Sequence, residues 1–354
     1  NCSGGVGLDG RTWLTCEETT HGKHRGYAQD HGYVFQVPVR TTDGQPVKGE
    51  PIRAMGRFNH EAVVVDPRTG IHYLTEDRFG SACGFYRFVP VNPRNLLEGG
   101  TLQMLAVAGQ DHYDTRKGQR LHRELPVRWV TIAEPDAGYD DTGDFTQTPY
   151  RMALGKVSGQ GFAGGAAAFD RLEGAIWSGD SVFFTSTSGG DAPQNAPNVF
   201  LDAFTGAEYV PGYGQVWEYR PSRHGGGKLR LVFESPGNTV LDSPDGVTLT
   251  PRGGLLLCED DTAWTDGDTH AAAPGIINPN RLVGLGHDGR PFDFAVQTVP
   301  LAPNPEKAGS TSNEFAGATF SPDGSTLFVN LYGNGQERSG LTAAITGPWR
   351  RGPL

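Results

Sequence analysis

The chain has 354 residues, enough to bury a large core, and a formal net charge of −10. This acidic balance argues against nucleic acid as a partner, and no apolar run approaches the roughly 18 residues that a membrane-spanning helix needs. The 51 glycines, 25 prolines and short apolar runs predict many turns and short strands, and therefore an all-β protein.

Five stretches along the chain repeat one pattern: an apolar strand, a turn with glycine, and a second apolar strand. This pattern predicts five β-hairpins. They are expected near residues 4–18, 61–76, 174–186, 246–259 and 315–331. A third strand, rich in aromatic or branched residues, is predicted after each of the first four hairpins. These third strands are expected at 32–39, 84–91, 214–221 and 281–289.

A four-stranded antiparallel unit repeated five or six times is typical of a β-propeller. The sequence therefore predicts a single β-propeller domain over residues 1–354, with about six blades. The wide interval between the second and third units is interpreted as an outer strand plus a long insertion with a short helix. A sixth blade is expected either in this interval or upstream of Asn1, and in the second case the ring of this chain is incomplete. The alternative fold is a large β-sandwich.

One potential metal ligand of anionic type stands near the start of each first strand. In a propeller these innermost strands line the central channel, so the five side chains are expected to converge. Like charges in one small pocket need cations or protons to neutralise them. Carboxylates favour Ca²⁺ or Mg²⁺ and a thiolate favours a transition metal, so the set predicts more than one kind of ion. The five residues are Cys2, Glu61, Glu173, Asp245 and Glu314.

Pairs of acids end three of the second strands, at the same end of the channel. Each acid alone is equally well a solvated turn residue, but their shared register predicts a second ring of ligands. Two arginines beside the acids are either counter-charges or, for Arg171, a bidentate group for an anionic substrate. His60 is expected to be a packing or hydrogen-bonding residue. The paired acids are Glu17 and Glu18, Glu76 and Asp77, and Glu259 and Asp260, and the second arginine is Arg78.

The remaining chemical motifs are weak. Cys16 and Cys258 stand in apolar strand contexts, "WLTCEE" and "LLLCEDD", and are predicted to be small buried side chains. No C-x-x-C is present, which excludes a zinc ribbon. The chain also lacks a G-x-S-x-G elbow, and "GQGFAGG" lacks the lysine and the strand context of a nucleotide-binding loop.

Taken together, six stretches in order give the chain a family resemblance. "NCSGG…TWLTCEE", "GRFNHEA", "RLEGAIW", "SPDGVTLTPRGGLLLCEDD", "NEFAGATFSPDGSTLFVN" and "TAAITGPWR" resemble the PhoX-type alkaline phosphatases of bacteria over nearly the whole chain. The resemblance implies a six-bladed propeller, exported in folded form by the twin-arginine route to the periplasm or the medium. It implies a cofactor of two ferric ions and three calcium ions joined by a bridging oxo group. The N-terminal stretch of the family, with its export signal, is expected to be missing here.

The resemblance also assigns roles within the predicted ring. Cys2 is expected to ligate iron, and Arg171 to bind the phosphate of a small phosphomonoester that a monomeric enzyme hydrolyses. The paired acids, including Asp260, are expected to belong to the calcium shell. Two alternatives stay open: a calcium-dependent lactonase or phosphodiesterase on the same scaffold, and a non-catalytic calcium-binding propeller. A thiolate favours the iron enzyme over a structural calcium site, unless Cys2 is simply a free or disulfide-bonded cysteine near a terminus.

Overall fold

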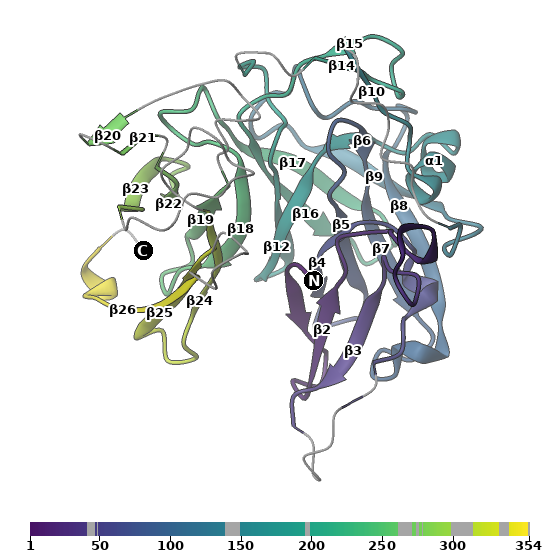
Figure 1. The fold of residues 1–354 in the computed structure, drawn as a ribbon, viewed down its shortest axis with the longest axis horizontal. Coiled ribbons are helices and arrows are strands. Elements are labelled where there is room, and N and C mark those ends of the chain that lie inside the picture. Colours follow the sequence, from purple (N-terminus) through teal and green to yellow (C-terminus); the bar gives the residue numbers. More distant parts are fainter. Residues whose placement is uncertain are drawn as a thin grey trace.

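A computed structural model of the chain shows antiparallel sheets arranged like blades around a central channel, with little helix (Figure 1). It describes residues 1–40, 47, 49–138, 149–194, 199–260, 271–273, 276–277, 279–298, 314–332 and 340–352.

Five blades follow one another along the chain, and each begins with a hairpin. The first contains β1 (Gly4–Val6), β2 (Thr12–Cys16) and β3 (Val34–Pro38). The second contains β4 (His60–Val65), β5 (His72–Glu76), β7 (Phe85–Pro90) and β8 (Gly100–Val107). The third contains β12 (Leu172–Ser178), β13 (Ser181–Ser186), β16 (Gln215–Pro221) and β17 (Gly227–Glu234). The fourth contains β18 (Pro244–Leu249), β19 (Leu255–Glu259), β22 (Arg281–Leu285) and β23 (Pro291–Val296). The fifth contains β24 (Phe315–Phe320), β25 (Thr326–Leu331) and β26 (Leu341–Thr346).

All five predicted hairpins and all four predicted third strands are confirmed. In each blade the turn glycine and the alternation of apolar residues fix the hairpin locally. The turn glycines Gly10, Gly70, Gly179, Gly253 and Gly324 all have positive φ, between 61° and 86°. This conformation favours glycine over residues with a side chain.

The wide interval between the second and third blades contains no separate blade within the described residues. Strand β9 (Leu125–Thr131) pairs with the outer strands β8 and β17 and so joins two blades into one nine-stranded sheet. The only α-helix of the described chain, α1 (Lys156–Ala163), follows it. The prediction of an outer strand and a short helix is therefore confirmed.

Small elements complete the described fold. Two short pairs are β6 (Ala82–Cys83) with β11 (Phe169–Asp170), and β20 (Ala271–Ala273) with β21 (Ile276–Ile277). A three-stranded insertion sheet consists of β10 (Tyr150–Arg151), β14 (Phe200–Leu201) and β15 (Glu208–Tyr209). Short 3₁₀ turns occur at Lys23–Arg25, Arg53–Met55, Leu96–Glu98 and Trp349–Arg351.

Hydrophobic cores lie between the faces of successive blades. Each core buries the apolar face of one sheet against the next, which is how a blade that is thin by itself becomes stable. Representative buried pairs, from the first interface to the fourth, are Leu14 and Phe88, Phe85 and Trp217, Val216 and Leu257, and Leu256 and Leu327.

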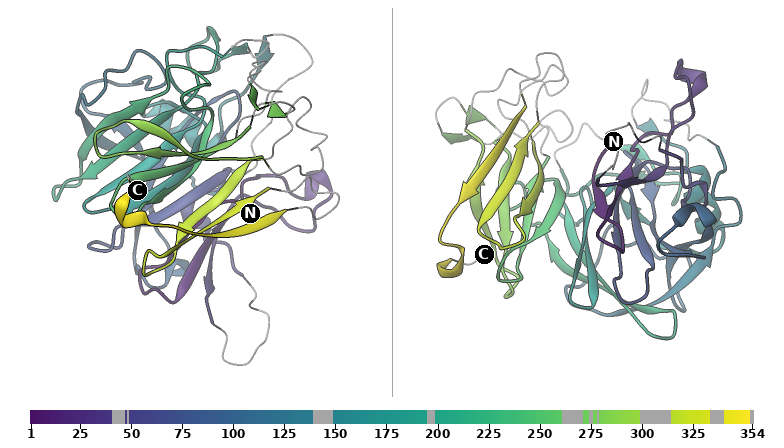
Figure 2. Two further views of the ribbon diagram at one scale, coloured as in Figure 1. Left: turned by 90° about the vertical axis from the view of Figure 1, so that its left-hand side faces the viewer. Right: turned by 90° about the horizontal axis from the view of Figure 1, so that it is seen from below.

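The first strands of the blades lie side by side around the channel, in the order β1, β4, β12, β18 and β24. Between β24 and β1 the described residues leave the ring open, as the view from below shows (Figure 2). A hollow of about 870 Å³ lies along these five strands. Its walls include the exposed rings of Trp13 and Tyr332, one on each side of the opening.

Candidate metal centre

Three of the predicted ligands, Glu61, Glu173 and Asp245, lie where the first strands are irregular. The register of β4 with β5 shifts between His60 and Val63, and the corresponding strands of the third and fourth blades shift just around Glu173 and Asp245. Such β-bulges change the direction in which a side chain points. Each of these three blades therefore turns one acid out of the regular alternation and towards the channel.

Glycine lets the first strands approach closely at this level. A Cβ at Gly174 would lie only 2.7 Å from the amide nitrogen of Val247 in the next blade. Hydroxyl groups then connect the blades. Thr75 of β5 donates to the carbonyl of Glu173 (2.6 Å), and Thr185 of β13 donates to the carbonyl of Asp245 (2.7 Å). A threonine of one blade thus fixes the backbone of the acid in the following blade.

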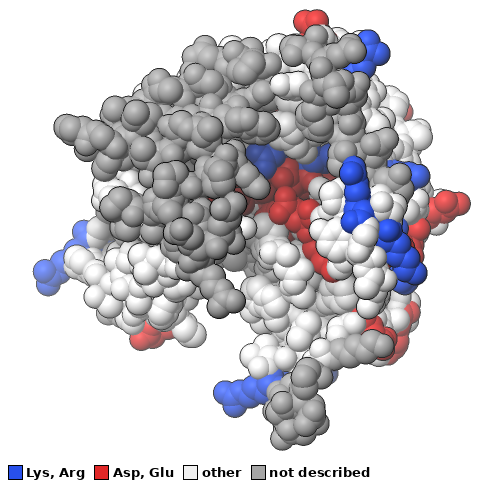
Figure 3. All heavy atoms as spheres, viewed as in Figure 1, with Lys and Arg blue, Asp and Glu red and all other residues white. Residues whose placement is uncertain are grey.

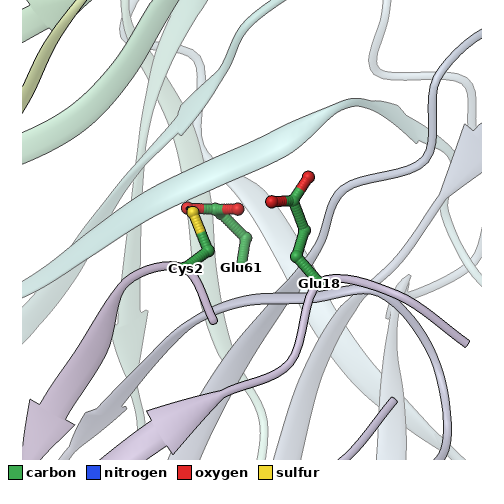
Figure 4. Close-up of side chains that lie close together, drawn as sticks. All are labelled: Cys2, Glu18 and Glu61. Carbon is green, nitrogen blue, oxygen red and sulfur yellow. The ribbon is translucent and has the colours of Figure 1, made fainter. Parts of the chain in front are cut away.

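Two overlapping groups of donor atoms result. One potential ligand atom each from Cys2, Glu18 and Glu61 lie within 4.8 Å of one another, and the same holds for Glu61, Glu173 and Asp245. Figure 4 shows the first three side chains pointing toward one another. The Cys2 thiol donates to Oε1 of Glu61 over 2.8 Å. Glu61 is common to both groups and is therefore the centre of the cluster.

The other oxygen of Glu61 is the clearest sign that the cluster lacks a partner. Glu61 is fully buried, and its Oε2 accepts no hydrogen bond from the described residues. A buried carboxylate oxygen without a donor is costly, by about 1–3 kcal/mol or more. Since this atom faces other acids, a cation would satisfy it better than another hydrogen-bond donor.

The pKa values of the cluster residues also favour a bound cation. Burial raises the pKa of Glu61, and the nearby Asp245 and Glu18 raise it further. Burial, together with Asp77, also raises the pKa of Glu173 and brings the pKa of Glu18 to about 8. The pKa of the Cys2 thiol is raised as well, by burial and then by the acids around it. Without cations the cluster must hold protons, and bound cations would reverse these shifts.

Arg171 is the cation nearest to the cluster. Its Nε and Nη2 each donate to Asp77 over 3.1 Å, and Nη2 also donates to Glu173 over 2.7 Å. Burial opposes its charge, but Asp77 and Glu173 outweigh burial and raise its pKa. The bidentate side of the guanidinium is thus occupied by Asp77. Only Nη1 makes no hydrogen bond within the described ranges.

The two outermost predicted ligands stand apart from this core. Glu314, directly before β24, lines the same hollow as Cys2 and Glu61 but belongs to neither compact group. Asp260, directly after β19, contributes to the raised pKa of Arg171 and therefore faces the same region.

The two acids of each pair have different contacts. In each pair the first acid accepts the backbone N–H at the start of the next strand of its own blade. Glu17 accepts from Gly32 and Tyr33, and its Oε1 lies 2.7 Å from Nδ1 of His31. The second acid of this pair, Glu18, faces the cluster, because successive side chains of an extended segment point in opposite directions.

The other two pairs repeat this division. Glu76 accepts from the amide of Gly84 and the hydroxyl of Tyr86, both over 2.8 Å. Glu259 accepts from the amide and the guanidinium of Arg281 in an ion pair of 2.6 Å. The described contacts of Glu17, Glu76 and Glu259 are thus contacts within a blade. Sequence reasoning treated both acids of a pair alike and did not separate Asp77 from its neighbour.

Two simpler predictions can be compared directly with the structure. Cys16 and Cys258 are fully buried in the cores, as expected, and Cys83 is buried too. His60 stacks on Phe58, with ring centroids 3.7 Å apart, and so acts in packing. Arg78 donates to the carbonyl of Ala153.

The surface agrees with this distribution of charge. Viewed along the channel, the described part of the molecule shows a hollow with acidic side chains at its centre and several basic side chains on its margin (Figure 3). An acidic hollow attracts cations, and basic groups around it favour an anion that arrives after them.

The chain matches a protein family and a solved structure that is similar enough to inform the fold. A family model described as "Alkaline phosphatase PhoX" matches residues 1–335. The structure of Pseudomonas fluorescens PhoX in complex with vanadate, a transition state analogue, is 21% identical, with a TM-score of 0.60 over 97% of this chain and 68% of that chain. This likeness supports the propeller fold.

Two other solved structures match with lower scores. A luciferin-regenerating enzyme is 10% identical, with a TM-score of 0.36 over 98% of this chain and 91% of that chain. The periplasmic gluconolactonase of Pseudomonas aeruginosa is 15% identical, with a TM-score of 0.30 over 97% and 69%. Among curated proteins no relative was found.

Proposed function

The chain belongs to the alkaline phosphatase PhoX family, and on this premise we propose that it hydrolyses phosphomonoesters to an alcohol and inorganic phosphate at a metal cluster in the channel. The observation that carries the proposal is the group around Glu61, with its buried oxygen that lacks a donor. The structure of Pseudomonas fluorescens PhoX contains vanadate, a transition state analogue, which supports phosphoryl chemistry on this fold.

The residues present fit a mixed metal cluster. Glu61, Glu173 and Asp245 supply the oxygen donors that calcium prefers, and the Cys2 thiolate adds a ligand suited to iron. We propose two ferric and three calcium ions with a bridging oxo group as the cofactor, and Glu18, Glu314 and Asp260 as further ligands. When bound, such ions stabilise the negative charge that develops on the phosphoryl and leaving oxygens.

The side chains of the protein then bind and orient the ester. Nη1 of Arg171, which makes no hydrogen bond to the described residues, is available to donate to a phosphate oxygen, while Asp77 fixes the guanidinium through its other two nitrogens. Arg171 thus contributes a single oriented hydrogen bond to the phosphate. Because the hollow is large and open on one side, the alcohol part of a small ester can extend towards the opening.

We also propose that the enzyme acts outside the cytoplasm, in the periplasm or the medium, after export by the twin-arginine route, and that it is a monomer. No helix in the described ranges is long and apolar enough to cross a membrane. Export in the folded state fits a cluster whose ligands come from five blades and assemble only when the ring has formed.

The test compares Cys2→Ser with Cys16→Ser in protein loaded with iron and calcium. Cys2→Ser exchanges a thiolate for a hydroxyl of similar size, so iron and the hydrolysis of a chromogenic phosphomonoester should be lost while calcium is partly retained. Cys16→Ser buries a hydroxyl in a core, which should cost about 1–3 kcal/mol but leave activity per folded molecule intact.

Elemental analysis and turnover are measured on both variants and on the wild type, with a phosphodiester and a lactone as alternative substrates. Full iron and full activity in Cys2→Ser would contradict the metal role of the thiol. Turnover of the lactone or the diester, without turnover of the monoester, would contradict the proposed function itself.

A further inference from the structure

Among the described strands, the insertion sheet β10–β14–β15 pairs with none of the five blades, yet it reaches Arg171 from two directions. The sheet lies above the third blade in Figure 1, next to the small pair β6 and β11. Tyr209 of β15 and Phe200 of β14 are directly opposite each other in the antiparallel pair. Both side chains contact groups that adjoin Arg171.

The first contact passes through Asp170, the residue before Arg171. The Tyr209 hydroxyl donates to Oδ2 of Asp170 over 2.6 Å, and Asp170 is only 2% exposed. The carbonyl of Asp170 accepts from the Ser186 hydroxyl over 2.5 Å, and the carbonyl of Arg171 accepts from the amide of Thr187 over 2.9 Å. The backbone on both sides of Arg171 is therefore fixed.

This support matters because the backbone of Arg171 is strained. Its φ of +46° lies in the left-handed region, which costs a residue with a side chain about 1–2 kcal/mol. A residue stays in this conformation only when its surroundings impose it. If Arg171 relaxed to negative φ, its side chain would leave Asp77 and Glu173.

The second contact passes through Phe79. The rings of Phe200 and Phe79 meet edge to face, with centroids 5.3 Å apart, and the Phe79 ring lies 5.9 Å from the guanidinium carbon of Arg171. Gly80 makes this approach possible, since a Cβ there would lie 2.4 Å from the Phe200 ring. The segment that carries Asp77 is thus packed against the same sheet.

Tyr209 is itself held rigidly. The guanidinium of Arg116 lies over its ring, 4.4 Å from the centroid. Arg116 is 1% exposed and forms ion pairs of 2.7 Å with Asp114 and with Asp202, which lies directly after β14. With its ring fixed in this way, the Tyr209 hydroxyl lies 2.6 Å from Oδ2 of Asp170 and, in a longer contact, 3.3 Å from the carbonyl of Ser188.

We propose that Tyr209 and Asp170 are positioning residues for Arg171, and that the insertion sheet exists to hold the phosphate-binding guanidinium in its working orientation. The inference rests on the proposed function, because it assigns the anion at Nη1 of Arg171 to phosphate. Neither residue contacts the metal ligands through a described hydrogen bond, so their removal should weaken phosphate binding without removing metal.

The test uses the metal-loaded enzyme and six variants: Tyr209→Phe, Tyr219→Phe, Arg171→Lys, the double variant Tyr209→Phe/Arg171→Lys, Asp170→Asn and Asp170→Ala. Tyr219 is the matched control, because its buried hydroxyl donates to the carbonyl of Gly226 within the third blade. The dissociation constant of inorganic phosphate is measured by calorimetry, KM and kcat with a chromogenic phosphomonoester, and iron and calcium by elemental analysis.

Tyr209→Phe should weaken phosphate binding and raise KM by about tenfold, the effect of one hydrogen bond to a charged group, with kcat changed less and metal content unchanged. Tyr219→Phe should stay within about twofold of wild type. In the Arg171→Lys background, Tyr209→Phe should have almost no further effect, because its action passes through Arg171. Asp170→Asn, which keeps an acceptor for the hydroxyl, should show a smaller loss than Asp170→Ala.

The inference is overturned if Tyr209→Phe matches the Tyr219→Phe control, if it loses metal together with phosphate affinity, or if its effect is equally large in the Arg171→Lys background. Should Tyr209→Phe fail to fold, the order of the two Asp170 variants decides the same question. Since calorimetry needs no turnover, an inactive wild type would contradict the proposed function alone, and the phosphate affinities would still decide the role of Tyr209.

Discussion

Replacing Glu61 by glutamine should have opposite effects on the metal-free and the metal-loaded protein. In the metal-free protein Glu61 is a buried acid with one oxygen that has no donor, surrounded by Glu18, Glu173 and Asp245. The amide of glutamine is neutral without a bound proton and offers two N–H donors to these carboxylates. Relieving one unsatisfied buried group is worth about 1–3 kcal/mol, so the metal-free variant should be more stable than wild type.

The thermal shift follows from the size of the chain. With about 2.1 cal/mol/K of unfolding entropy per residue, 354 residues give about 0.7 kcal/mol/K. A gain of 1–3 kcal/mol therefore raises Tm by about 1.5–4 °C in the presence of a chelator. With calcium at a hundred times its dissociation constant, wild type gains about 2.7 kcal/mol from binding, which the variant should lose.

Differential scanning calorimetry of both proteins, with chelator and with calcium, measures these shifts. Glu218→Gln is the matched control, since Glu218 is buried in the third blade but accepts from Ser181 and two arginines. Losing these bonds should destabilise the control by about 2–3 kcal/mol under both conditions. If Glu61→Gln lowers the Tm of the chelated protein as the control does, the reasoning about an unsatisfied centre is wrong.

Two further outcomes are expected. The free energy of unfolding of the metal-free protein should fall as pH rises from about 5 to 8. The pKa of Glu18 in the folded state, about 8, lies above its ordinary value. In this pH range the folded state therefore still binds a proton that the unfolded state has released, and raising the pH favours unfolding. Glu18 lies at an exposed edge of the cluster, where solvent reduces this fall in unfolding free energy to about 1 kcal/mol. The midpoints of urea unfolding should show the fall in the presence of a chelator and should not show it when calcium is added. Glu259→Gln should cost about 3–5 kcal/mol by breaking the buried pair with Arg281, yet keep the bound calcium. Asp260→Asn should lose bound calcium with little loss of stability. Equal calcium content in both variants would contradict the assignment of different roles to the two acids of a pair.

The hairpins and the converging first strands could be predicted because their signals are local. A turn glycine with an apolar strand on each side recurs five times, with an acid near the start of four first strands and a cysteine near the start of the other, and the propeller follows from that repetition. The proximity of Cys2 and Glu61 also followed from this register, since both stand at the level where the first strands meet.

The parts that escaped prediction depend on contacts between distant segments. The stretches "TED" and "CEDD" do not indicate which acid accepts the N–H of the next strand. The donors are the amides of Gly84 and Arg281, which lie further along the chain. The use of the Arg171 fork on Asp77 joins residues 94 positions apart. The support from Tyr209 comes from an insertion whose sequence carries no pattern of its own.

The distribution of the acids over several blades would couple the binding of cations to the packing of the first strands against one another. Each blade has its own hairpin and shares a core with its neighbours, but the groups that face the channel repel one another when no cation is present. Cys2, Glu61, Glu173 and Asp245 come from four different blades, so any ion that binds them together also draws four first strands together. Stabilisation by ligand therefore acts on the ring as a whole rather than on one sheet. Arg171 reduces the repulsion within the cluster, because its guanidinium pairs with Asp77 and Glu173. Its strained backbone holds the guanidinium in this position, with Nη1 making no hydrogen bond to the described residues and so available to an anion.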